Sequence, residues 1–425
     1  MKAIGIDLGT TSICGVVIDT QTGQVVRSRT ENSNAFIKTE NSWEKIQDPE
    51  KIINIATGIL DDFITEDTVV IGVTGQMHGI VYTDRQGIAI SPLYTWQDGR
   101  GNLPYNNTTY AEHMNSHSGY GNVTHFYNCQ NGLVPAEAKG FCTIHDYLVM
   151  HICGLHSALI HVSDAASFGC FDLEKGEYSC SCDVTVINDY HIAGNYKGIP
   201  VSVAIGDNQA SVFSSLANDD DILLNVGTGS QISVVSDRAV WGDGIETRPY
   251  FEGKYLIVGA ALCGGRAYAV LKDFYKKIIS YVTDADDKAI YDIMDKMLSE
   301  SDETLKVDTR FSGTRGNEGI RGSITGISTE NFTPAALTDG LLCGMVEELF
   351  GMYCDMDCKR NGLVGSGNGI RKNPYLIKVA ENRFGASLKI PAHTEEAAYG
   401  AALFALISSG YFTSSKEAKK LINYL

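Results

Sequence analysis

Long apolar runs and an excess of positive charge are both missing from the 425-residue chain. No stretch of 18 uncharged apolar residues occurs, which argues against a membrane-spanning helix. Asp7 interrupts the first apolar run too early for the hydrophobic region of a signal peptide. The net charge is −17 and no basic stripe opposes it, so the chain would repel a nucleic acid or an anionic membrane. We therefore expect a cytoplasmic protein with neither a nucleic acid nor a membrane as partner.

Several cofactor and metal motifs are missing as well. Neither the Walker A pattern Gly-x4-Gly-Lys-Ser/Thr nor a Gly-x-Gly-x-x-Gly turn after a strand occurs, which disfavours the P-loop and dinucleotide-binding folds. In a cytoplasmic protein we expect the eleven cysteines to be reduced thiols. They include no Cys-x2-Cys pair, so we expect no structural zinc. Glycine, in contrast, is plentiful at 44 residues. Backbone N–H groups in glycine-rich turns bind phosphate without side-chain charge, so an acidic chain can still bind a nucleotide.

The apolar pattern predicts strands that alternate with helices. Residues 3–7, 13–19 and 25–30 are β-branched apolar runs separated by polar turns, which is typical of strands. Asp48, followed by a proline, is the expected first cap of a helix. Residues 69–73 form a short unbroken apolar run, as in a strand buried on both faces. The alternation indicates an α/β fold.

One pattern occurs twice. A strand, a polar Gly-Thr turn and a second strand are expected at residues 4–18 and again at residues 223–235. The two turns lie 218 positions apart, about half of the chain. We interpret this echo as two domains of similar type, 1–205 and 206–425, each with a Gly-Thr turn that could bind one side of a polyphosphate.

Five motifs stand in the order found in the FGGY carbohydrate kinases. They are Asp-Leu-Gly-Thr-Thr-Ser at 7–12, Gly-Gln-Met-His-Gly at 75–79, Trp-Gln-Asp-Gly-Arg at 96–100, Gly-Asp-Asn-Gln at 206–209 and Gly-Thr-Gly at 227–229. The whole chain resembles this family. The resemblance implies two ribonuclease-H-like domains of the actin-type ATPase fold that face a central cleft. It also implies a kinase that uses ATP and Mg²⁺ to phosphorylate a small sugar.

Within the family, three segments resemble the sedoheptulokinase branch, namely 143–147, 163–169 and 208–212. The expected reaction is therefore phosphorylation of a ketose at its terminal hydroxyl, sedoheptulose giving sedoheptulose 7-phosphate. Residues 135–140 replace a Lys-x-x-Trp-Leu element of the family, and this difference bears on the sugar. Xylulose or another pentulose is the alternative substrate. A non-catalytic actin-like ATPase or sugar sensor is a more remote alternative. The oligomeric state stays open.

The first Gly-Thr turn is a candidate phosphate site. Gly9, Thr10, Thr11 and Ser12 are expected at the β- and γ-phosphates, because glycine permits close backbone approach and hydroxyl groups donate hydrogen bonds. An ordinary hairpin turn is the alternative interpretation. Asp7, at the end of the preceding strand, is the candidate Mg²⁺ ligand, directly or through water.

Asp207 is the candidate general base that accepts the proton of the sugar hydroxyl. Local sequence alone favours a helix N-cap for Asp207, and it is the resemblance to the family that reverses this preference. The resemblance places Gln76, Met77 and His78 at the sugar together with Asp207, and a strand-end turn with a buried methionine is the alternative for this segment. Asp98 and Arg100 suit a structural pair as well as a sugar contact.

A second group of residues is expected at the nucleotide. The group comprises Gly227, Thr228 and Gly229 in the second Gly-Thr turn, and Gly367, Asn368 and Asn373 after a strand, in a segment that resembles the adenosine motif of the family. A helix that begins near Thr394 contains five small residues. We expect it to pack closely beside the adenosine segment.

Overall fold

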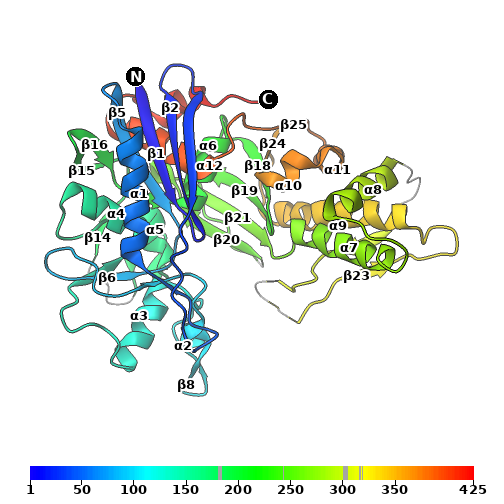
Figure 1. The fold of residues 1–425 in the computed structure, drawn as a ribbon, viewed down its shortest axis with the longest axis horizontal. Coiled ribbons are helices and arrows are strands. Elements are labelled where there is room, and N and C mark those ends of the chain that lie inside the picture. Colours follow the sequence, from blue (N-terminus) through cyan, green and yellow to red (C-terminus); the bar gives the residue numbers. More distant parts are fainter. Residues whose placement is uncertain (180–183, 243, 300–304, 315–316, 318) are drawn as a thin grey trace. The chain divides into compact units, whose positions relative to one another are not determined.

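The structure, a computed structural model, describes residues 1–179, 184–242, 244–299, 305–314, 317 and 319–425 (Figure 1). The chain divides into two compact units. Unit 1 comprises Met1–Ala217, Arg248–Lys254 and His393–Asn423, and unit 2 comprises Asn218–Thr247, Tyr255–Ala392 and Tyr424–Leu425. These units differ from the expected halves 1–205 and 206–425. The difference arises because the helix after residue 205 and a helix near the C-terminus both belong to unit 1.

Unit 1 is built on a mixed seven-stranded sheet with the order β15-β16-β5-β1-β2-β3, in which β17 also pairs with β5. The strands are β1 (Lys2–Leu8), β2 (Ser12–Asp19), β3 (Val25–Asn32), β5 (Thr68–Gly75), β15 (Ile192–Tyr196), β16 (Ile199–Ser202) and β17 (Ile205–Gly206). β1 pairs antiparallel with β2 and parallel with β5. The four strands expected from the apolar pattern are confirmed.

Helix α1 (Pro49–Phe63) contacts the hairpin of β1 and β2, and α4 (Ile144–Cys153) contacts β5. The side chain of Asp48 accepts a hydrogen bond from Lys51 N and caps α1, as the sequence predicts. The apolar face of α1, which includes Ile52, Ile59 and Phe63, is buried in the core of the unit.

Helix α12 (Glu396–Ser408) packs on β1, β5 and α6 (Asp207–Ser215). The approach is so close that a Cβ on Gly5 would lie 1.8 Å from the Ala398 carbonyl oxygen. A Cβ on Gly400 would lie 1.9 Å from the carbonyl oxygen of Ala210 in α6. The small residues of α12 therefore pack on the sheet and on α6 of unit 1, where the sequence analysis expected contact with the adenosine segment.

Shorter elements complete unit 1. They are β4 (Ile46–Gln47), β6 (Val81–Thr83), β7 (Leu93–Tyr94), η1 (Gly99–Asn102), β8 (Pro104–Tyr105), β9 (Thr108–Thr109), α2 (Tyr110–His113), α3 (Gly121–Gln130), β10 (Gly140–Cys142), β11 (Leu159–His161), α5 (Val162–Ser167), β12 (Phe171–Asp172), β13 (Glu177–Tyr178), β14 (Thr185–Ile187), η2 (Phe251–Gly253), α13 (Ser415–Ala418) and η3 (Lys419–Leu421).

Unit 2 contains a six-stranded sheet with the order β20-β21-β19-β18-β24-β25. Its strands and helices are β18 (Asp221–Val226), β19 (Ser230–Ser236), β20 (Ile245–Pro249), β21 (Tyr255–Ala261), α7 (Gly265–Ile279), α8 (Asp287–Ser299), β22 (Lys306–Asp308), β23 (Ser323–Thr325), α9 (Pro334–Asp355), β24 (Gly362–Ser366), α10 (Gly367–Lys372), α11 (Pro374–Phe384) and β25 (Leu388–Lys389). The core lies between the sheet and these helices, with Leu224, Leu271 and Met345 among its members.

The two sheets share one local design. In unit 1 the antiparallel pair β1 and β2 has a parallel neighbour, β5, beside its first strand. In unit 2 the antiparallel pair β18 and β19 has the parallel neighbour β24 in the corresponding place. The repeated strand-turn-strand pattern of the sequence therefore corresponds to a repeated structural unit.

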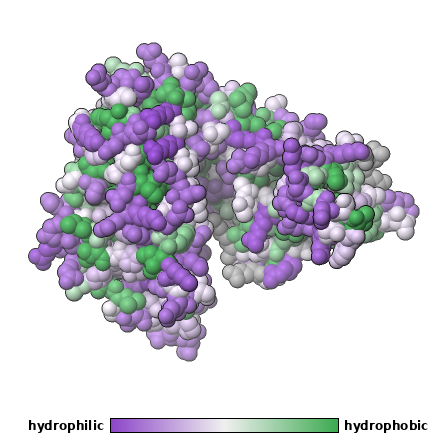
Figure 2. Space-filling view, viewed as in Figure 1, coloured by the Kyte–Doolittle hydropathy of each residue, from purple (hydrophilic) through white to green (hydrophobic). Residues whose placement is uncertain are grey.

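Among the described residues, no helix combines the length and hydrophobicity that a membrane crossing requires. In Figure 2, hydrophilic side chains cover most of the visible surface, and apolar residues gather in small scattered patches.

Candidate active site

The sheet of unit 1 brings Asp7 and Asp207 to the same edge. Strands β1 and β17 both run parallel to β5, and Asp7 and Ile205 both pair with Thr74. Thr74 Oγ1 donates a hydrogen bond of 2.7 Å to the Ile205 carbonyl and so ties two of the strand ends together. Asp7 is the penultimate residue of β1, and Asp207 directly follows β17. Both carboxylates thus lie at the carboxyl ends of parallel strands, where open α/β sheets bind ligands.

The Asp7 carboxylate has acidic surroundings. Its Oδ1 atom is buried and accepts no hydrogen bond among the described residues. Burial raises the pKa of Asp7 to about 7, Asp207 and Glu395 act in the same direction, and His145 opposes them. A buried oxygen atom without a protein donor, beside a second carboxylate, is a suitable ligand for a hard cation such as Mg²⁺.

The turn after β1 is tight. A Cβ on Gly9 would lie 2.9 Å from the Ser12 carbonyl oxygen, so a larger residue would displace the backbone. Gln47 Nε2 donates to the Thr10 carbonyl at 2.6 Å, and the Ser33 hydroxyl donates to the Thr11 carbonyl at 3.2 Å. These bonds engage two carbonyl groups of the turn and hold its shape. Phosphate binding by the turn stays a prediction.

Asp207 is the first residue of α6, and Gly206 is the N-cap. Because Gly206 takes the N-cap position, the N-cap alternative for Asp207 is not the arrangement that the structure has. The Gly206 N–H donates to Ser163 Oγ at 3.0 Å, which fixes the backbone just before the carboxylate. Burial raises the pKa of Asp207 to about 6, and the positive charges of His145 and Arg248 limit the rise. A carboxylate with this pKa is ionised at neutral pH and still basic enough to accept a proton.

The segment after β5 has three different environments. Gln76 is buried, and its Nε2 donates to Gln47 Oε1 at 2.9 Å. Met77 is buried against Gly206, since a Cβ on that glycine would lie 2.7 Å from Met77 Sδ. Gln76 and Met77 thus support the strand ends, and of the three residues only His78 is partly exposed.

Two neighbours hold His78 in a strained backbone conformation with φ 72°. Its N–H donates to Ser167 Oγ at 3.1 Å, and its Nδ1 lies 2.8 Å from the Ser167 carbonyl oxygen. Because a carbonyl only accepts, Nδ1 carries the proton. The Tyr120 ring stacks on the imidazole with centroids 4.3 Å apart. The ring of His78 therefore has a fixed orientation and tautomer.

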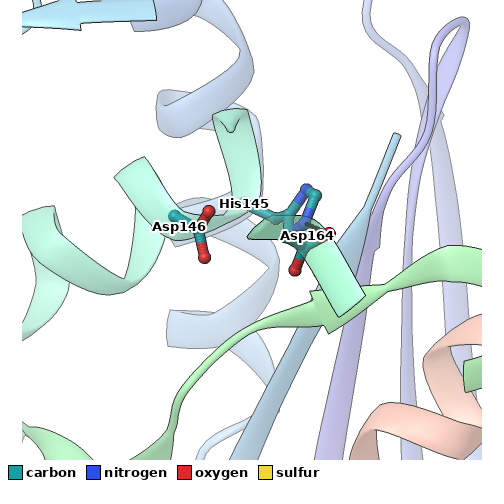
Figure 3. A group of neighbouring side chains, drawn as sticks. All are labelled: His145, Asp146 and Asp164. Atoms are coloured by element: carbon teal, nitrogen blue, oxygen red, sulfur yellow. Dashed lines mark ion pairs between the residues drawn. The ribbon is translucent and has the colours of Figure 1, made fainter. Parts of the chain in front are cut away.

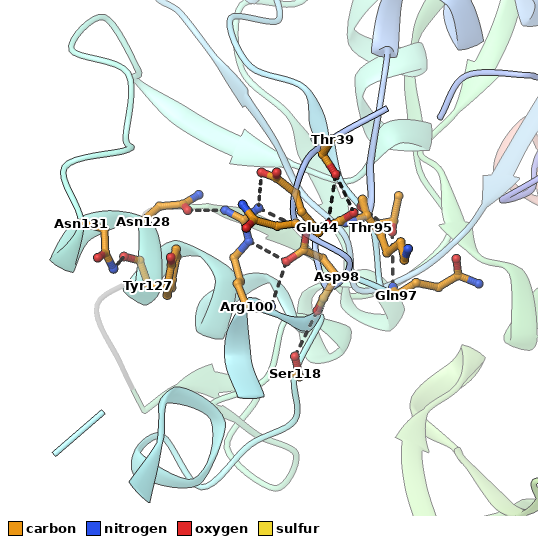
Figure 4. A network of polar contacts seen from close by, with 12 residues as sticks. Thr39, Glu44, Thr95, Gln97, Asp98, Arg100, Ser118, Tyr127, Asn128 and Asn131 are labelled. Carbon is orange, nitrogen blue, oxygen red and sulfur yellow. Dashed lines mark hydrogen bonds and ion pairs between the residues drawn. The ribbon is translucent and has the colours of Figure 1, made fainter. Parts of the chain in front are cut away.

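Asp98 and Arg100 of the Trp96–Arg100 motif form a buried network (Figure 4). Arg100 is 1% exposed, and its Nε donates to Asp98 Oδ1 at 2.6 Å. Arg100 Nη1 donates to Asn128 Oδ1 at 2.6 Å, and the guanidinium lies over the Tyr94 ring. This geometry favours the structural alternative for Asp98 and Arg100. Trp96 is 47% exposed, and its Nε1 donates to Thr10 Oγ1 at 2.9 Å.

A buried cluster beside Asp7 and Asp207 was not assigned any role by sequence reasoning. Figure 3 shows His145 and Asp146 from α4 near Asp164 from α5. His145 Nε2 lies 3.0 Å from Asp164 Oδ1, and all three residues are buried. Their ligand atoms lie within 4.8 Å of one another, a spacing that could hold a metal ion. His145 and Asp164 already form an ion pair, and Asp146 Oδ2 accepts from Thr143 Oγ1 at 2.7 Å. We interpret the cluster as a charged hydrogen-bonded group.

Unit 2 places its candidate nucleotide residues at one sheet edge. Gly227, Thr228 and Gly229 connect β18 to β19, and the N–H groups of Gly265 and Arg266 at the start of α7 donate to the carbonyls of Gly227 and Thr228. Gly367 begins α10 with φ 80°, and a Cβ there would lie 2.6 Å from the Val226 carbonyl oxygen. The second turn and the Gly367 segment are thus neighbours.

The other two residues of the adenosine segment have defined local places. Asn368 lies in the first turn of α10. Asn373 caps α11, because its Oδ1 accepts from Leu376 N at 2.9 Å. Their contact with a nucleotide stays a prediction.

Sequence comparison decides the family. Residues 2–192 match the N-terminal domain of the FGGY family of carbohydrate kinases, and residues 222–409 match its C-terminal domain. The chain belongs to the FGGY family of carbohydrate kinases. This FGGY protein is 28% identical to the sedoheptulokinase of Mus musculus, over 95% of the chain and 97% of the relative. It is 23% identical to a xylulose kinase of Staphylococcus epidermidis, over 96% of the chain and 88% of that relative.

Solved structures agree on the fold. The xylulose kinase of Rhodospirillum rubrum superposes with a TM-score of 0.84 at 18% identity, covering 100% of this chain and 93% of that one. The glycerol kinase of Plasmodium falciparum with ADP gives a TM-score of 0.76 at 17% identity, covering 99% of this chain and 92% of that one. The predictions of an α/β protein with two actin-type ATPase domains, and of a carbohydrate kinase, are confirmed.

Proposed function

We propose that this FGGY kinase transfers the γ-phosphate of ATP to the terminal hydroxyl of a ketose, and that sedoheptulose, giving sedoheptulose 7-phosphate, is its substrate. One observation carries the chemistry. Asp207 begins a helix at the carboxyl end of a strand, in the same sheet edge as Asp7, with a pKa raised to about 6. A general base at that edge, beside an acidic metal-binding residue, suits phosphoryl transfer to an alcohol.

Asp207 acts as the general base. It accepts the hydroxyl proton while the hydroxyl oxygen forms a bond to the γ-phosphorus. The bond between that phosphorus and the β,γ-bridging oxygen breaks, and ADP leaves. The N–H groups at the start of α6 favour negative charge beside Asp207, which helps the transferring phosphoryl group to approach.

Asp7 is the proposed protein ligand of Mg²⁺, directly or through water. Its buried Oδ1 without a hydrogen-bond donor and the nearby carboxylates of Asp207 and Glu395 fit a hard cation. Mg²⁺ bound there would neutralise charge on the phosphates of ATP. The adjoining turn of Gly9, Thr10, Thr11 and Ser12 would bind the β- and γ-phosphates through N–H and hydroxyl groups.

In unit 2 we assign ATP to the edge formed by the second Gly-Thr turn and the segment that begins at Gly367. Gly227, Thr228 and Gly229 would bind phosphate, and Gly367, Asn368 and Asn373 the adenosine. The proximity of Gly367 to the Val226 carbonyl supports one continuous site within this unit. The sedoheptulokinase relatives match nearly the whole chain at 28% identity, which supports the seven-carbon sugar.

His78 is the residue of the 76–78 segment that we assign to direct sugar contact. It is partly exposed and held by Ser167 and Tyr120. Gln76 and Met77 would support it and the first phosphate turn. We also propose a cytoplasmic location, which the free thiols of the described cysteines support.

An ATP-consumption screen with ketoses of five to seven carbons tests this function. We expect ADP formation that depends on the sugar and is strongest with sedoheptulose. Preference for xylulose would favour the pentulose alternative, which the xylulose kinase relatives support. ATP consumption with none of these sugars would contradict a ketose kinase.

A further inference from the structure

We propose that His145, held by Asp164, is a positioning residue that supplies a fixed positive charge beside the general base Asp207. This inference deepens the proposed function and rests on it. The pair is buried in unit 1, between the first turn of α4 and the short helix α5.

Two buried acids next to His145 favour a positive charge on its imidazole ring. Asp146 and Asp164 are at most 1% exposed, and both are close to His145. Both carboxylate oxygens of Asp164 are buried, and Oδ1 forms an ion pair with His145 Nε2 at 3.0 Å. The His145 ring lies against the end of β5, where a Cβ on Gly75 would be 3.0 Å from Nδ1. A neutral imidazole there would leave these carboxylates without a counter-charge.

A second buried histidine provides a contrast. His161 is fully buried, but its Nδ1 accepts a hydrogen bond from the Ser163 N–H at 3.2 Å. A ring nitrogen that accepts carries no proton, so His161 is neutral. Its ring faces the rings of Phe251 and Phe404. Burial lowers the pKa of His161 to about 4. For His145 burial acts in the same direction, but the carboxylates of Asp164, Asp146 and Asp207 together outweigh it, and the pKa of His145 rises to about 9.

Helix α5 connects this charge to the rest of the site. Ser163 Oγ accepts the Gly206 N–H just before Asp207, and Asp164 pairs with His145. Ser167, at the end of the same helix, holds His78. Three residues of one short helix therefore fix the base, its counter-charge and the candidate sugar ligand relative to one another.

The expected effect follows from the charges around Asp207. The charged groups that interact with Asp207, with Asp7 or with His145 are Asp146 from α4, Asp164 from α5, Arg248 from β20 and Glu395 before α12, in addition to these three residues themselves. A positive charge favours the ionised base. Without the charge of His145, Asp207 would keep its proton to a higher pH.

The test compares the pH dependence of kcat/KM for three single variants of the full-length enzyme with ATP, Mg²⁺ and the best ketose. His145→Gln removes the charge, Asp164→Asn removes its partner, and His161→Gln is the control for loss of a buried neutral histidine. We expect the acid limb of His145→Gln to move to higher pH by about one unit, with a smaller move in the same direction for Asp164→Asn. The limb of His161→Gln should stay at the wild-type position.

An acid limb of His145→Gln at the wild-type pH would overturn the proposal. If that variant does not fold, His145→Lys replaces it in the test. An acid limb of kcat/KM at the wild-type pH would then support the charge role, and an acid limb at higher pH would overturn it.

A measurement that needs no turnover separates this proposal from the kinase function. Nitrogen NMR of the wild-type protein at pH 7.5 should show two N–H groups on His145 and one on His161. A neutral His145 would overturn the proposal even if the kinase assay succeeds.

Discussion

Replacing Asp207 with Asn tests the role of the general base with little steric change. Asn is nearly isosteric with Asp, so the Gly206 N–H bond to Ser163 Oγ and the start of α6 should persist. The variant cannot accept the hydroxyl proton. We expect turnover to fall by about 10² to 10⁴, which corresponds to about 3 to 5 kcal/mol of transition-state stabilisation. Affinity for a nonhydrolysable ATP analogue should change little, because the assigned adenosine residues lie in unit 2.

The same substitution should make the free protein more stable. The folded state raises the pKa of Asp207 from 3.8 to about 6, about two units, so ionised Asp207 costs the fold up to about 3 kcal/mol. A raised carboxyl pKa means that this cost is absent below pH 3.8 and complete above about pH 6. At pH 8 we expect Asp207→Asn to unfold with a free energy about 1 to 3 kcal/mol larger, because burial of the neutral amide of Asn also costs free energy and offsets part of the gain.

A coupled ADP assay, calorimetric titration with the ATP analogue and urea unfolding at pH 8 give the three readouts. Asp220→Asn, at an exposed acid in unit 2, is the matched control and should keep wild-type turnover and stability. Near-wild-type turnover of Asp207→Asn would refute the base. A joint loss of turnover, nucleotide affinity and stability would show that Asp207 is structural.

Three further predictions concern the wild-type pH profile and the packing. The kcat/KM of the wild type should fall about tenfold per pH unit below about pH 6, as Asp207 becomes protonated. A fall in kcat/KM that begins only near pH 4 would contradict the raised pKa of Asp207. Arg100→Ala should cost about 3 to 5 kcal/mol in urea unfolding because it leaves the Asp98 carboxylate buried without its partner, and a loss under 1 kcal/mol would contradict this. Gly400→Ala should lower the melting temperature by several degrees, because the added Cβ would clash with the Ala210 carbonyl. Gly58→Ala in α1 is the control and should not lower it, because no atom lies within 4 Å of the added Cβ. Equal effects of the two substitutions would refute the close packing of α12.

The sequence predicts those parts of the fold that local patterns determine. The strands at residues 3–7 and 69–73 are visible as apolar runs, and the repeated Gly-Thr turn reveals the second sheet. The sequence places Asp7 and Asp207 at strand ends but assigns them to different halves, 1–205 and 206–425, whereas the structure places both strands in the sheet of unit 1. A strand end is therefore visible in the sequence, but the sheet to which the strand belongs is not.

Other features depend on contacts that no local pattern encodes. His145 and Asp164 lie 19 positions apart on two short helices, and the sequence of either helix gives no sign that the pair is buried. The small residues of α12 indicate close packing, but the partner could not be read from them; it is the sheet of unit 1. The extent of the units follows from this packing, which joins residues near the C-terminus to β1.

The choice of sugar is the most direct test of the proposed function. Sedoheptulose and xylulose at equal concentration compete for the wild-type enzyme with ATP and Mg²⁺, and mass spectrometry quantifies both sugar phosphates at early times. A site built for seven carbons leaves polar groups unpaired with the shorter sugar. We predict that kcat/KM for sedoheptulose exceeds that for xylulose by at least about a hundredfold. Equal or reversed ratios would contradict the seven-carbon assignment, and the absence of both phosphates would contradict the ketose kinase itself.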